Sequence, residues 1–351
     1  MKDIIVQSNI TIRQAMKKLT QIGTKCLIIT DESKKLLGTL SDGDLRKTIL
    51  GGTNFGDSIE NFYQKKPTML LQDEYSLEYA RKLFIRYKFD LIPVVDNEGV
   101  LRDVLFLESV LKNGDQKQEG RLDVPVVIMA GGKGTRMEPF TKVLPKPLVP
   151  VHDKPVIEHI IERFTDVGFG EFYLTVNYKG KILKAYFEEL QPDYKVDFIE
   201  EREPLGTAGS LRFLDGKFSG PFFVTNCDII IKTDYASLYE FHQKGGYDIT
   251  LVASAKEYII PYGTCELNSE GHLSHINEKP RYDFLINTGL YVVNHDMLQL
   301  IPEDSFYHII HLIQEANKRK KKVGVFPIDD DAWIDVGQWS EYRRAEDKLI
   351  K

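Results

Sequence analysis

The pattern of apolar and polar residues occurs twice along the first 115 residues of the chain. In each copy, apolar residues recur every three to four positions, which predicts an amphipathic helix, and a short apolar run then predicts a strand. Thr11 and Ser76, residue types that commonly cap helix N-termini, precede the two predicted helices. The copies match without a gap, with Thr11 falling on Ser76 and Ala15 on Ala80. We therefore predict an internal repeat, with copies at about 1–57 and 58–115.

Each copy continues from its first predicted strand, at residues 27–30 or 92–95, through a polar turn into a second strand. Neither copy is large enough to bury a stable core alone, so we expect the two to pack together as one α+β module over residues 1–115. The polar stretch at residues 112–123 has two glycines and no apolar periodicity, which predicts a linker.

The second strand of the first copy leads into a short polar segment that resembles a known family. Residues 36–46 resemble part of a CBS domain, so the repeat is identified as a tandem CBS pair. The resemblance implies that Ser41 and Asp44 contact the ribose of an adenine nucleotide. The second copy has Leu105 and Glu108 at these positions, so we expect its cleft to lack this contact. The alternative is that Ser41 simply caps a helix whose first turn carries Asp44.

Residues 124–351 show a different pattern, in which predicted strands alternate with predicted helices. Such alternation with short links implies βαβ units and a mostly parallel, Rossmann-like α/β sheet, with ligands gathered at the carboxyl ends of the strands. A length of 351 residues fits two domains of ordinary size. The predicted strands are residues 126–130, 172–176 and 196–200, and the predicted helices are residues 156–167 and 181–190.

A glycine-rich loop with basic residues follows the first of these strands. Glycine lets the backbone approach a ligand closely, and Lys133, Arg136 and Lys146 add positive charge, so the loop is suited to phosphate. It is not the dinucleotide fingerprint, because Met137 stands where a third glycine is required, and it is not a P-loop, because Gly134 follows the glycine-lysine pair. A simple tight turn is the alternative, although the prolines on both sides of Lys146 restrict its backbone and favour a functional role.

Two aspartates that follow apolar runs are candidate metal ligands. A carboxylate in an apolar setting needs a partner, and Mg²⁺ is commonly held by one or two carboxylates together with substrate phosphates. Asp228 and Asp335 therefore form a candidate pair. For Asp228, a turn aspartate that accepts hydrogen bonds from backbone N–H groups is the alternative.

The segment 201–210 follows the predicted strand at 196–200 and is expected to open the next helix. Gly206 and Gly209 would let a base or a sugar approach the backbone, while Thr207 and Ser210 suit a helix start.

Composition excludes several classes of function. The formal net charge is -6, so the chain has no field that would attract nucleic acid. Three cysteines lie far apart without a C-x-x-C spacing, which indicates neither a disulfide framework nor a zinc site and suits a reducing compartment. No signal peptide is evident and no apolar run is long enough for a membrane-spanning helix, so we expect a cytoplasmic protein that does not enter a membrane.

Seven short segments, in this order over about residues 124–345, resemble the sugar-1-phosphate nucleotidyltransferases, the enzymes that make nucleotide sugars. They are Gly131-Gly132-Lys133-Gly134-Thr135-Arg136, Pro145-Lys146-Pro147, Leu205-Gly206-Thr207-Ala208-Gly209, Asn226-Cys227-Asp228, Glu278-Lys279-Pro280, Asn287-Thr288-Gly289 and Trp333-Ile334-Asp335-Val336-Gly337. The resemblance implies an enzyme that uses Mg²⁺ and takes a nucleoside triphosphate and a sugar 1-phosphate as substrates.

The resemblance also implies roles for single residues. Arg136, Lys146 and Asp228 are the expected catalytic residues, and Asp228 with Asp335 is expected to hold Mg²⁺. Lys133 is left as an exposed loop residue. Many members have glycine where Cys227 stands, and we interpret this cysteine as a small buried thiol without a catalytic role. The expected nucleotide contacts are Ala130, Gly131, Gly132, Gly134, Thr135 and Gly206, and the expected sugar-phosphate contacts are Gly263, Glu278, Lys279 and Asn287.

A CBS pair ahead of such a transferase resembles the guanylyltransferases of legionaminic-acid and related surface-sugar pathways. This resemblance implies GTP and glucosamine 1-phosphate as substrates, with UTP, CTP or dTTP and another hexose 1-phosphate as alternatives. A different class of function is a catalytically degenerate nucleotide sensor, although such a sensor would not need the full set of charged residues. The CBS pair either binds an adenine nucleotide that regulates the enzyme or serves only to dimerise it, and we expect a homo-oligomer.

Overall fold

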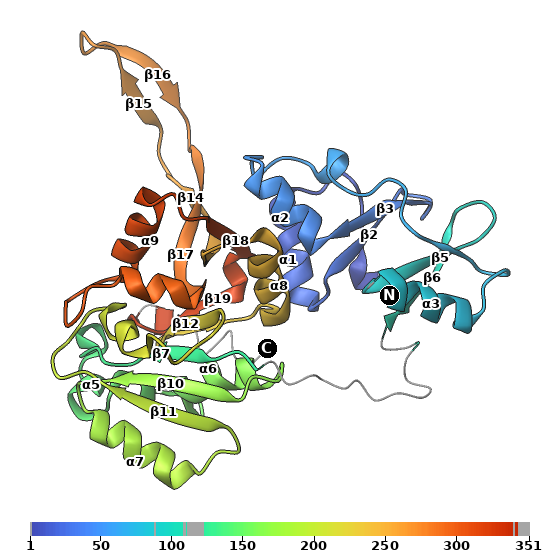
Figure 1. Ribbon diagram of the computed structural model, residues 1–351. Coiled ribbons are helices and arrows are strands. Elements are labelled where there is room, and N and C mark those ends of the chain that lie inside the picture. The colour runs from blue at the N-terminus through green and yellow to red at the C-terminus, as the bar shows by residue number, and fades with distance from the viewer. Residues whose placement is uncertain (1, 88, 108–109, 111–122, 340, 343–351) are drawn as a thin grey trace. The chain divides into compact units, whose positions relative to one another are not determined.

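The computed structural model describes the chain except residues 1, 88, 108–109, 111–122, 340 and 343–351 (Figure 1). Most of the predicted linker and Glu108 of the second repeat copy lie outside the described residues. The chain divides into two compact units. The first unit comprises Met1–Gln118, Ala255–Phe284 and Asp329–Asp331, and the second comprises Glu119–Ser254, Leu285–Ile328 and Ala332–Lys351. No helix in the described part of the chain is both long and apolar enough to cross a membrane.

The first unit contains two copies of the same arrangement of strands and helix. Each copy forms a three-stranded sheet whose first two strands are parallel and whose last two are antiparallel, and matching elements start at a constant offset. The first copy contains β1 (Ile5–Val6), α1 (Ile12–Ile22), β2 (Cys26–Thr30), β3 (Leu36–Ser41) and α2 (Asp42–Leu50), and the second contains β4 (Leu70–Leu71), α3 (Leu77–Tyr87), β5 (Leu91–Val95) and β6 (Leu101–Phe106).

Both predicted helix caps are present. Thr11 Oγ1 accepts a hydrogen bond from the Gln14 backbone N–H at 3.2 Å, and Ser76 Oγ accepts one from the Tyr79 backbone N–H at 3.2 Å. The two copies pack together, as expected, because a buried cluster joins Ile4 and Ile28 of the first copy to Leu91, Leu101 and Val104 of the second. These apolar side chains bury surface that neither copy could cover alone.

A seven-stranded sheet forms the centre of the second unit, in the order β11-β10-β7-β12-β17-β14-β18. The pairs β11–β10, β10–β7 and β7–β12 are parallel, which confirms the predicted mostly parallel α/β sheet, whereas β17 runs antiparallel to β12. The sheet strands are β7 (Val126–Met129), β10 (Glu171–Val176), β11 (Lys195–Glu200), β12 (Phe222–Asn226), β14 (Ile249–Ile259), β17 (Arg281–Val293) and β18 (Val323–Asp329).

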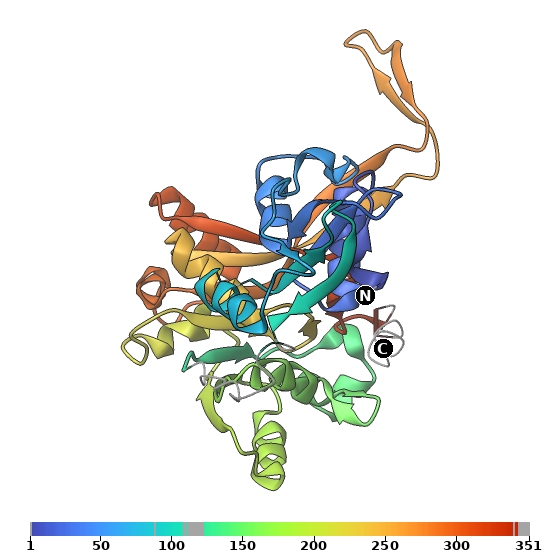
Figure 2. The ribbon, with the colours of Figure 1, turned by 90° about the vertical axis from the view of Figure 1, so that its right-hand side faces the viewer.

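Helices and short two-stranded ribbons accompany the sheets. The helices of the second unit are α5 (Phe140–Val143), α6 (Val156–Thr165), α7 (Gly180–Leu190), α8 (Tyr235–Gly245) and α9 (Ile309–Lys318). The short strands pair as three antiparallel ribbons, namely β8 (Pro150–Val151) with β9 (Lys154–Pro155), β13 (Ile229–Ile231) with β19 (Trp333–Asp335), and β15 (Thr264–Leu267) with β16 (Leu273–Asn277). The last of these is the narrow orange hairpin seen in both ribbon views (Figures 1 and 2).

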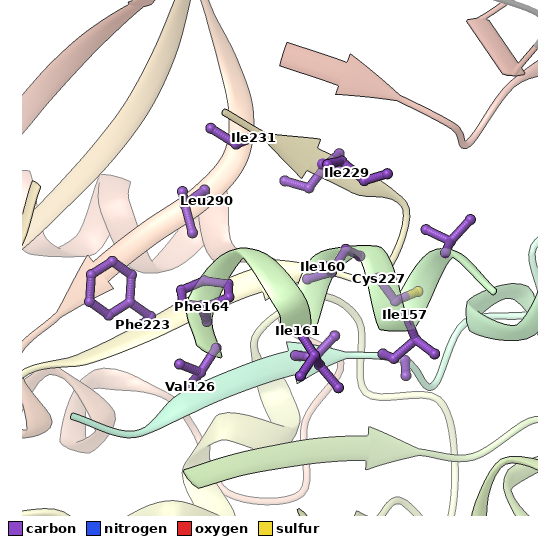
Figure 3. Packing of buried hydrophobic residues seen from close by; sticks show 14 of the residues in the cluster. Val126, Ile157, Ile160, Ile161, Phe164, Phe223, Cys227, Ile229, Ile231 and Leu290 are labelled. Carbon is purple, nitrogen blue, oxygen red and sulfur yellow. The ribbon is translucent and has the colours of Figure 1, made fainter. Parts of the chain in front are cut away.

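The main core of the second unit lies between α6 and the sheet. Figure 3 shows Phe164 of α6 beside Val126 and Phe223, and the rings of Phe164 and Phe223 meet edge to face at 5.6 Å between centroids. Edge-to-face aromatic pairs add attraction beyond the area they bury. This packing fixes β7 and β12 as neighbours, so the loops that follow the two strands leave the sheet side by side.

Candidate active site

A cleft of about 340 Å³ lies where the loops after β7, β11 and β12 meet. Ligands of parallel α/β sheets gather at this end of the strands. Of the residues predicted from the sequence, the cleft contains most of the glycine-rich loop, the two cations predicted to be catalytic, Arg136 and Lys146, and Asp228. It is lined by Met129, Gly131, Gly132, Gly134, Thr135, Arg136, Lys146, Thr175, Glu201, Pro204, Gly206, Thr207, Asn226, Cys227, Asp228 and Phe306.

The glycines of the loop after β7 differ in how much space a side chain would have. Gly134 has a φ of +66°, and a Cβ there would lie 3.0 Å from Lys146 Cβ, so glycine brings this loop against the lysine. A Cβ on Gly131 would lie 2.9 Å from the Glu201 carboxylate, whereas a Cβ on Gly132 would meet nothing within 4 Å. Lys133 is exposed, as expected.

The two aspartates predicted as metal ligands meet through the β13–β19 ribbon. Asp335 pairs in register with Ile229, and the Val336 backbone N–H donates to the Asp228 carbonyl oxygen at 2.8 Å. A Cβ on Gly337 would lie 2.2 Å from Asp228 Oδ2 and 3.0 Å from Asp335 Oδ1. Both carboxylates therefore face the same point, although they lie far apart in the sequence.

Burial and charge define the electrostatics of this pair. The Lys146 ammonium forms an ion pair with Asp228, and both side chains are almost buried. Burial raises the pKa of Asp335, and the negative charge of Asp228 raises it further, while the Gly337 backbone N–H, which donates to Asp335 at 2.7 Å, opposes the shift. Two adjacent carboxylates beside a lysine thus form a site where added positive charge is favourable.

These donors fit a magnesium ion. Mg²⁺ prefers oxygen ligands, keeps several waters and is usually held by one or two carboxylates with substrate phosphates supplying the rest. Among the described residues there is no cluster of three or more histidine, cysteine, aspartate or glutamate side chains, which would be typical of a site closed by protein ligands alone.

Glu201, which was not among the residues predicted from the sequence, is a buried acid that lines this cleft. Glu201 is 7% exposed. Its carboxylate lies against Gly131 and accepts a hydrogen bond from the Leu205 backbone N–H at 3.3 Å. A buried carboxylate requires hydrogen-bond donors, and a ligand in the cleft can provide them. The signal that could have revealed it was an acidic residue directly after a strand and before a glycine-containing loop.

The loop at residues 205–210 corrects one expectation. Thr207 and Ser210 were expected to suit the start of the next helix, but the 3₁₀ helix there, Gly209–Leu214, has no side-chain cap. Thr207 Oγ1 instead accepts a hydrogen bond at 3.0 Å from the backbone N–H of Ile309, the first residue of α9, and Ser210 Oγ is buried without a partner among the described residues. The sequence pattern could not show this, because the N–H that donates to Thr207 belongs to a residue 102 positions away.

Two glycines in the same loop pack closely against the backbone of another chain segment. A Cβ on Gly206 would lie 2.7 Å from the Tyr307 carbonyl oxygen, and one on Gly209 would lie 2.5 Å from that of Ser305. Glycine at these positions therefore permits the approach of the chain segment 305–307.

The predicted sugar-phosphate residues fall in both units. Gly263, Glu278 and Lys279 belong to the first unit, where a Cβ on Gly263 would lie 2.9 Å from the Glu278 carboxylate, so these two residues are neighbours. Asn287 belongs to the second unit, and its side-chain amide donates to the Tyr291 hydroxyl at 2.8 Å. Ala130 is buried behind the glycine loop and does not line the cleft.

The remaining candidates have local partners. Ser41 and Asp44 form a reciprocal capping box at the start of α2, in which each side chain accepts a hydrogen bond from the other's backbone N–H at 3.1 Å. Cys227 is buried, and burial raises the pKa of its thiol to about 12, as expected for a thiol that fills space.

Comparison with known proteins identifies the family. Residues 125–351 match the family model described as nucleotidyl transferase, and residues 1–51 match the CBS domain model. The chain belongs to the nucleotidyl transferase family. This nucleotidyl transferase is similar to mannose-1-phosphate guanyltransferases from Schizosaccharomyces pombe (36% identity over 226 residues, covering 62% of this chain and 61% of the relative) and Aspergillus oryzae (37% over 229 residues, 62% and 61%). The transferase thus spans about three-fifths of the length of these relatives.

Two solved structures are also similar to this transferase. The crystal structure of HddC from Yersinia pseudotuberculosis matches with a TM-score of 0.52 and 28% identity, covering 64% of this transferase and 99% of HddC. The structure of HddC complexed with GMP-PN matches with a TM-score of 0.51 and 26% identity over the same shares of each chain.

Proposed function

We propose that this transferase moves a guanylyl group from GTP to a sugar 1-phosphate and releases pyrophosphate. The observation that carries the proposal is the cleft at the carboxyl ends of β7 and β12, which Arg136, Lys146 and Asp228 line and where Asp335 adjoins Asp228. A reaction between two anionic substrates needs positive charge and positioning rather than a nucleophilic side chain. The names of the curated relatives support the guanylyl group.

In this reaction a phosphate oxygen of the sugar 1-phosphate attacks the α-phosphorus of the nucleotide, and the bond to the β-phosphate oxygen breaks. Arg136 and Lys146 would hold the triphosphate, and Lys279 would hold the attacking phosphate. Lys146, which is paired with Asp228 in the structure, would then exchange part of that contact for phosphate oxygens. Mg²⁺ held by Asp228 and Asp335 would supply positive charge to the phosphates and to the departing pyrophosphate.

Glu201 supports guanine as the base. Guanine presents two adjacent donors, N1–H and the N2 amino group, and a carboxylate offers two acceptors that match them. Uracil and thymine place a single N–H between two carbonyl oxygens, which a carboxylate would repel. A site built around buried polar groups rejects ligands that leave those groups unpaired.

The proposed sugar substrate is glucosamine 1-phosphate, which the combination of a CBS pair and a transferase supports, and mannose 1-phosphate is the competitor that the names of the curated relatives support. Glu278 and Asn287 are the proposed partners of the sugar hydroxyls, and Gly263 is proposed to line the sugar pocket.

The test is a screen of the purified protein with Mg²⁺, four nucleoside triphosphates and a panel of sugar 1-phosphates. Pyrophosphate release is followed continuously, and the nucleotide sugar is identified by mass. We expect the highest kcat/KM for GTP with glucosamine 1-phosphate, and a higher value with mannose 1-phosphate would overturn the proposed sugar but not the guanylyl transfer. Tight nucleotide binding without pyrophosphate release from any pair would contradict the proposal and support a nucleotide sensor.

We also propose that an adenine nucleotide binds next to Ser41 and Asp44 and regulates the enzyme. The match of residues 1–51 to the CBS domain model supports this proposal.

A further inference from the structure

Phe306 is an exposed aromatic residue on the wall of the active-site cleft. It is 61% exposed, whereas Phe164, Phe222 and Phe223 of the same unit are fully buried. Single exposed apolar residues are common on protein surfaces, so exposure alone does not indicate a ligand contact. The position of Phe306 does indicate one, because this residue lines the cleft that we assign to a nucleotide.

The backbone on both sides of Phe306 is fixed to the 205–210 loop. The Tyr307 N–H donates to the Leu205 carbonyl oxygen at 2.9 Å, and the Tyr307 carbonyl oxygen accepts from the N–H groups of Ala208 and Gly209 at 2.9 and 3.1 Å. Gly206 and Gly209 provide the space for this approach, as described above. The segment that carries Phe306 is therefore held in place and is not a free surface loop.

The ring itself also has a neighbour that restrains it. The Phe306 and His308 rings meet edge to face, with centroids 4.8 Å apart and planes at 80°. His308 is in turn held by its Nδ1, which lies 3.3 Å from Thr207 Oγ1. An aromatic ring whose surroundings are fixed in this way loses little conformational freedom when a ligand covers it.

The contacts along the cleft distinguish two ends. Gly134, Lys146 and Asp228 follow one another in direct contact, and Asp335 adjoins Asp228, so charge gathers at this end. At the other end the contacts run from Gly131 to Glu201, from Glu201 to the Leu205 N–H and from Leu205 to Tyr307. Phe306 directly precedes Tyr307, so these contacts connect it to Glu201, the acid suited to a base.

We propose that Phe306 stacks on the base of the nucleoside triphosphate, an inference that rests on the proposed function. Aromatic stacking uses the face of the base, which all bases share, whereas Glu201 reads the edge, which differs between bases. The two residues therefore have separable roles: Phe306 adds affinity for any nucleotide, and Glu201 selects guanine.

The test measures binding of a non-hydrolysable guanosine triphosphate analogue and its adenosine counterpart by calorimetry with Mg²⁺. One stacked base contributes about 1–3 kcal/mol, so Phe306→Ala should weaken binding by about 5- to 150-fold, by the same factor for both analogues. Phe306→Trp should retain wild-type affinity, and Phe306→Leu, which keeps apolar bulk without a ring, should behave like Phe306→Ala. In turnover assays the loss should appear in the KM for GTP with little change in kcat.

Phe213→Ala is the matched control, because Phe213 is 41% exposed, lies in the same unit and does not line the cleft. Its affinity for both analogues should equal that of the wild type. Wild-type affinity in Phe306→Ala or Phe306→Leu would overturn the stacking inference while leaving the proposed function intact. A wild-type protein that binds neither analogue would overturn both, and thermal unfolding of each variant shows that affinities are compared between folded proteins.

Discussion

At the scale of single residues, the ion pair between Lys146 and Asp228 is the centre of the cleft. Removing one partner of a buried pair leaves the other charge uncompensated, so the two residues depend on each other before any substrate binds. The same two side chains are the proposed phosphate and metal contacts. Under the proposed function, the pair would hold the lysine and the aspartate in place until phosphate and metal compete for them.

Lys146→Ala and Asp228→Asn should each lower kcat for pyrophosphate release by about 10²–10³-fold, because Lys146 is the proposed phosphate contact and Asp228 a proposed Mg²⁺ ligand. Lys133→Ala is the control, since Lys133 is an exposed lysine of the glycine loop outside the cleft, and it should turn over like the wild type. Circular dichroism establishes that all three variants are folded. Near-wild-type turnover in Lys146→Ala or Asp228→Asn would remove that residue from the mechanism.

Glu201→Gln should change the choice of base. The substitution replaces one acceptor by a donor, so one guanine donor loses its partner and kcat/KM for GTP should fall by about 10- to 100-fold. Competition of GTP with UTP at equal concentrations measures the change, and UTP should gain relative to GTP. Glu203→Gln, at an exposed acid two residues away, should preserve the wild-type preference. If both variants behave alike, Glu201 does not read the base.

The three cysteines should differ in their reaction with a thiol reagent at pH 8. Burial raises the pKa of both Cys26 and Cys227 to about 12, and the reactive thiolate is scarce so far below the pKa. Cys265 is exposed. One thiol per chain should react quickly in the folded protein, and Cys265→Ser should abolish that fast phase. A fast phase that survives this substitution would show that a second thiol is accessible.

Single residues also mark the limit of what the sequence could reveal. Arg136, Lys146 and Asp228 were found because they stand in recognisable segments, and the structure brings them to one cleft. Glu201 and Phe306 were missed because an acid or an aromatic residue gains meaning only from its neighbours. Those neighbours, Gly131 for Glu201 and the 205–210 loop for Phe306, are distant in sequence.

At the scale of elements, the β13–β19 ribbon explains how two distant aspartates meet. Its register places Asp335 opposite Ile229, which follows Asp228 directly, and the Val336 N–H to Asp228 carbonyl bond extends the pairing. Local propensity predicted the parallel strands β7, β10 and β11 well, because β7 and most of β10 are apolar runs and β11 alternates apolar Val196 and Phe198 with charged neighbours. It could not predict this short ribbon, since strands of three residues carry little signal and their pairing is long-range.

Gly337→Ala should disrupt the two carboxylates without unfolding the protein. The added Cβ would lie 2.2 Å from Asp228 Oδ2, so the ribbon or the aspartate must move, and a shift of about 1 Å at such a site can lower turnover about 10²-fold. The assay is pyrophosphate release over a range of Mg²⁺ concentrations, with a higher Mg²⁺ requirement expected. Gly220→Ala, where a Cβ would meet nothing within 4 Å, should leave both values unchanged. An unaltered Mg²⁺ dependence in Gly337→Ala would separate the carboxylates from metal binding.

At the scale of the whole molecule, a transferase sheet and a duplicated α+β module are joined in one chain. The repeat could be predicted closely because its two copies share the spacing of every matched element, which an insertion in either copy would have broken. Its role could not be predicted in the same way. Ser41 and Asp44 satisfy each other's backbone N–H groups, so the same two side chains serve as a helix cap whether or not a ligand binds.

Thr11 provides the means to separate these two roles, because Thr11 and Gln14 form the same reciprocal capping box at the start of α1. Ser41→Ala and Thr11→Ala should each lose about 0.5–2 kcal/mol of stability, since both remove a cap.

If an adenine nucleotide binds beside Ser41, then AMP or ATP should raise the unfolding temperature of the wild type and of Thr11→Ala, because binding to the folded state stabilises it. The same nucleotides should stabilise Ser41→Ala much less and should change pyrophosphate release only in proteins that they stabilise. If AMP and ATP change neither the melting temperature nor the turnover of the wild type, the repeat is only a scaffold. If they stabilise all three proteins equally, the nucleotide binds away from Ser41.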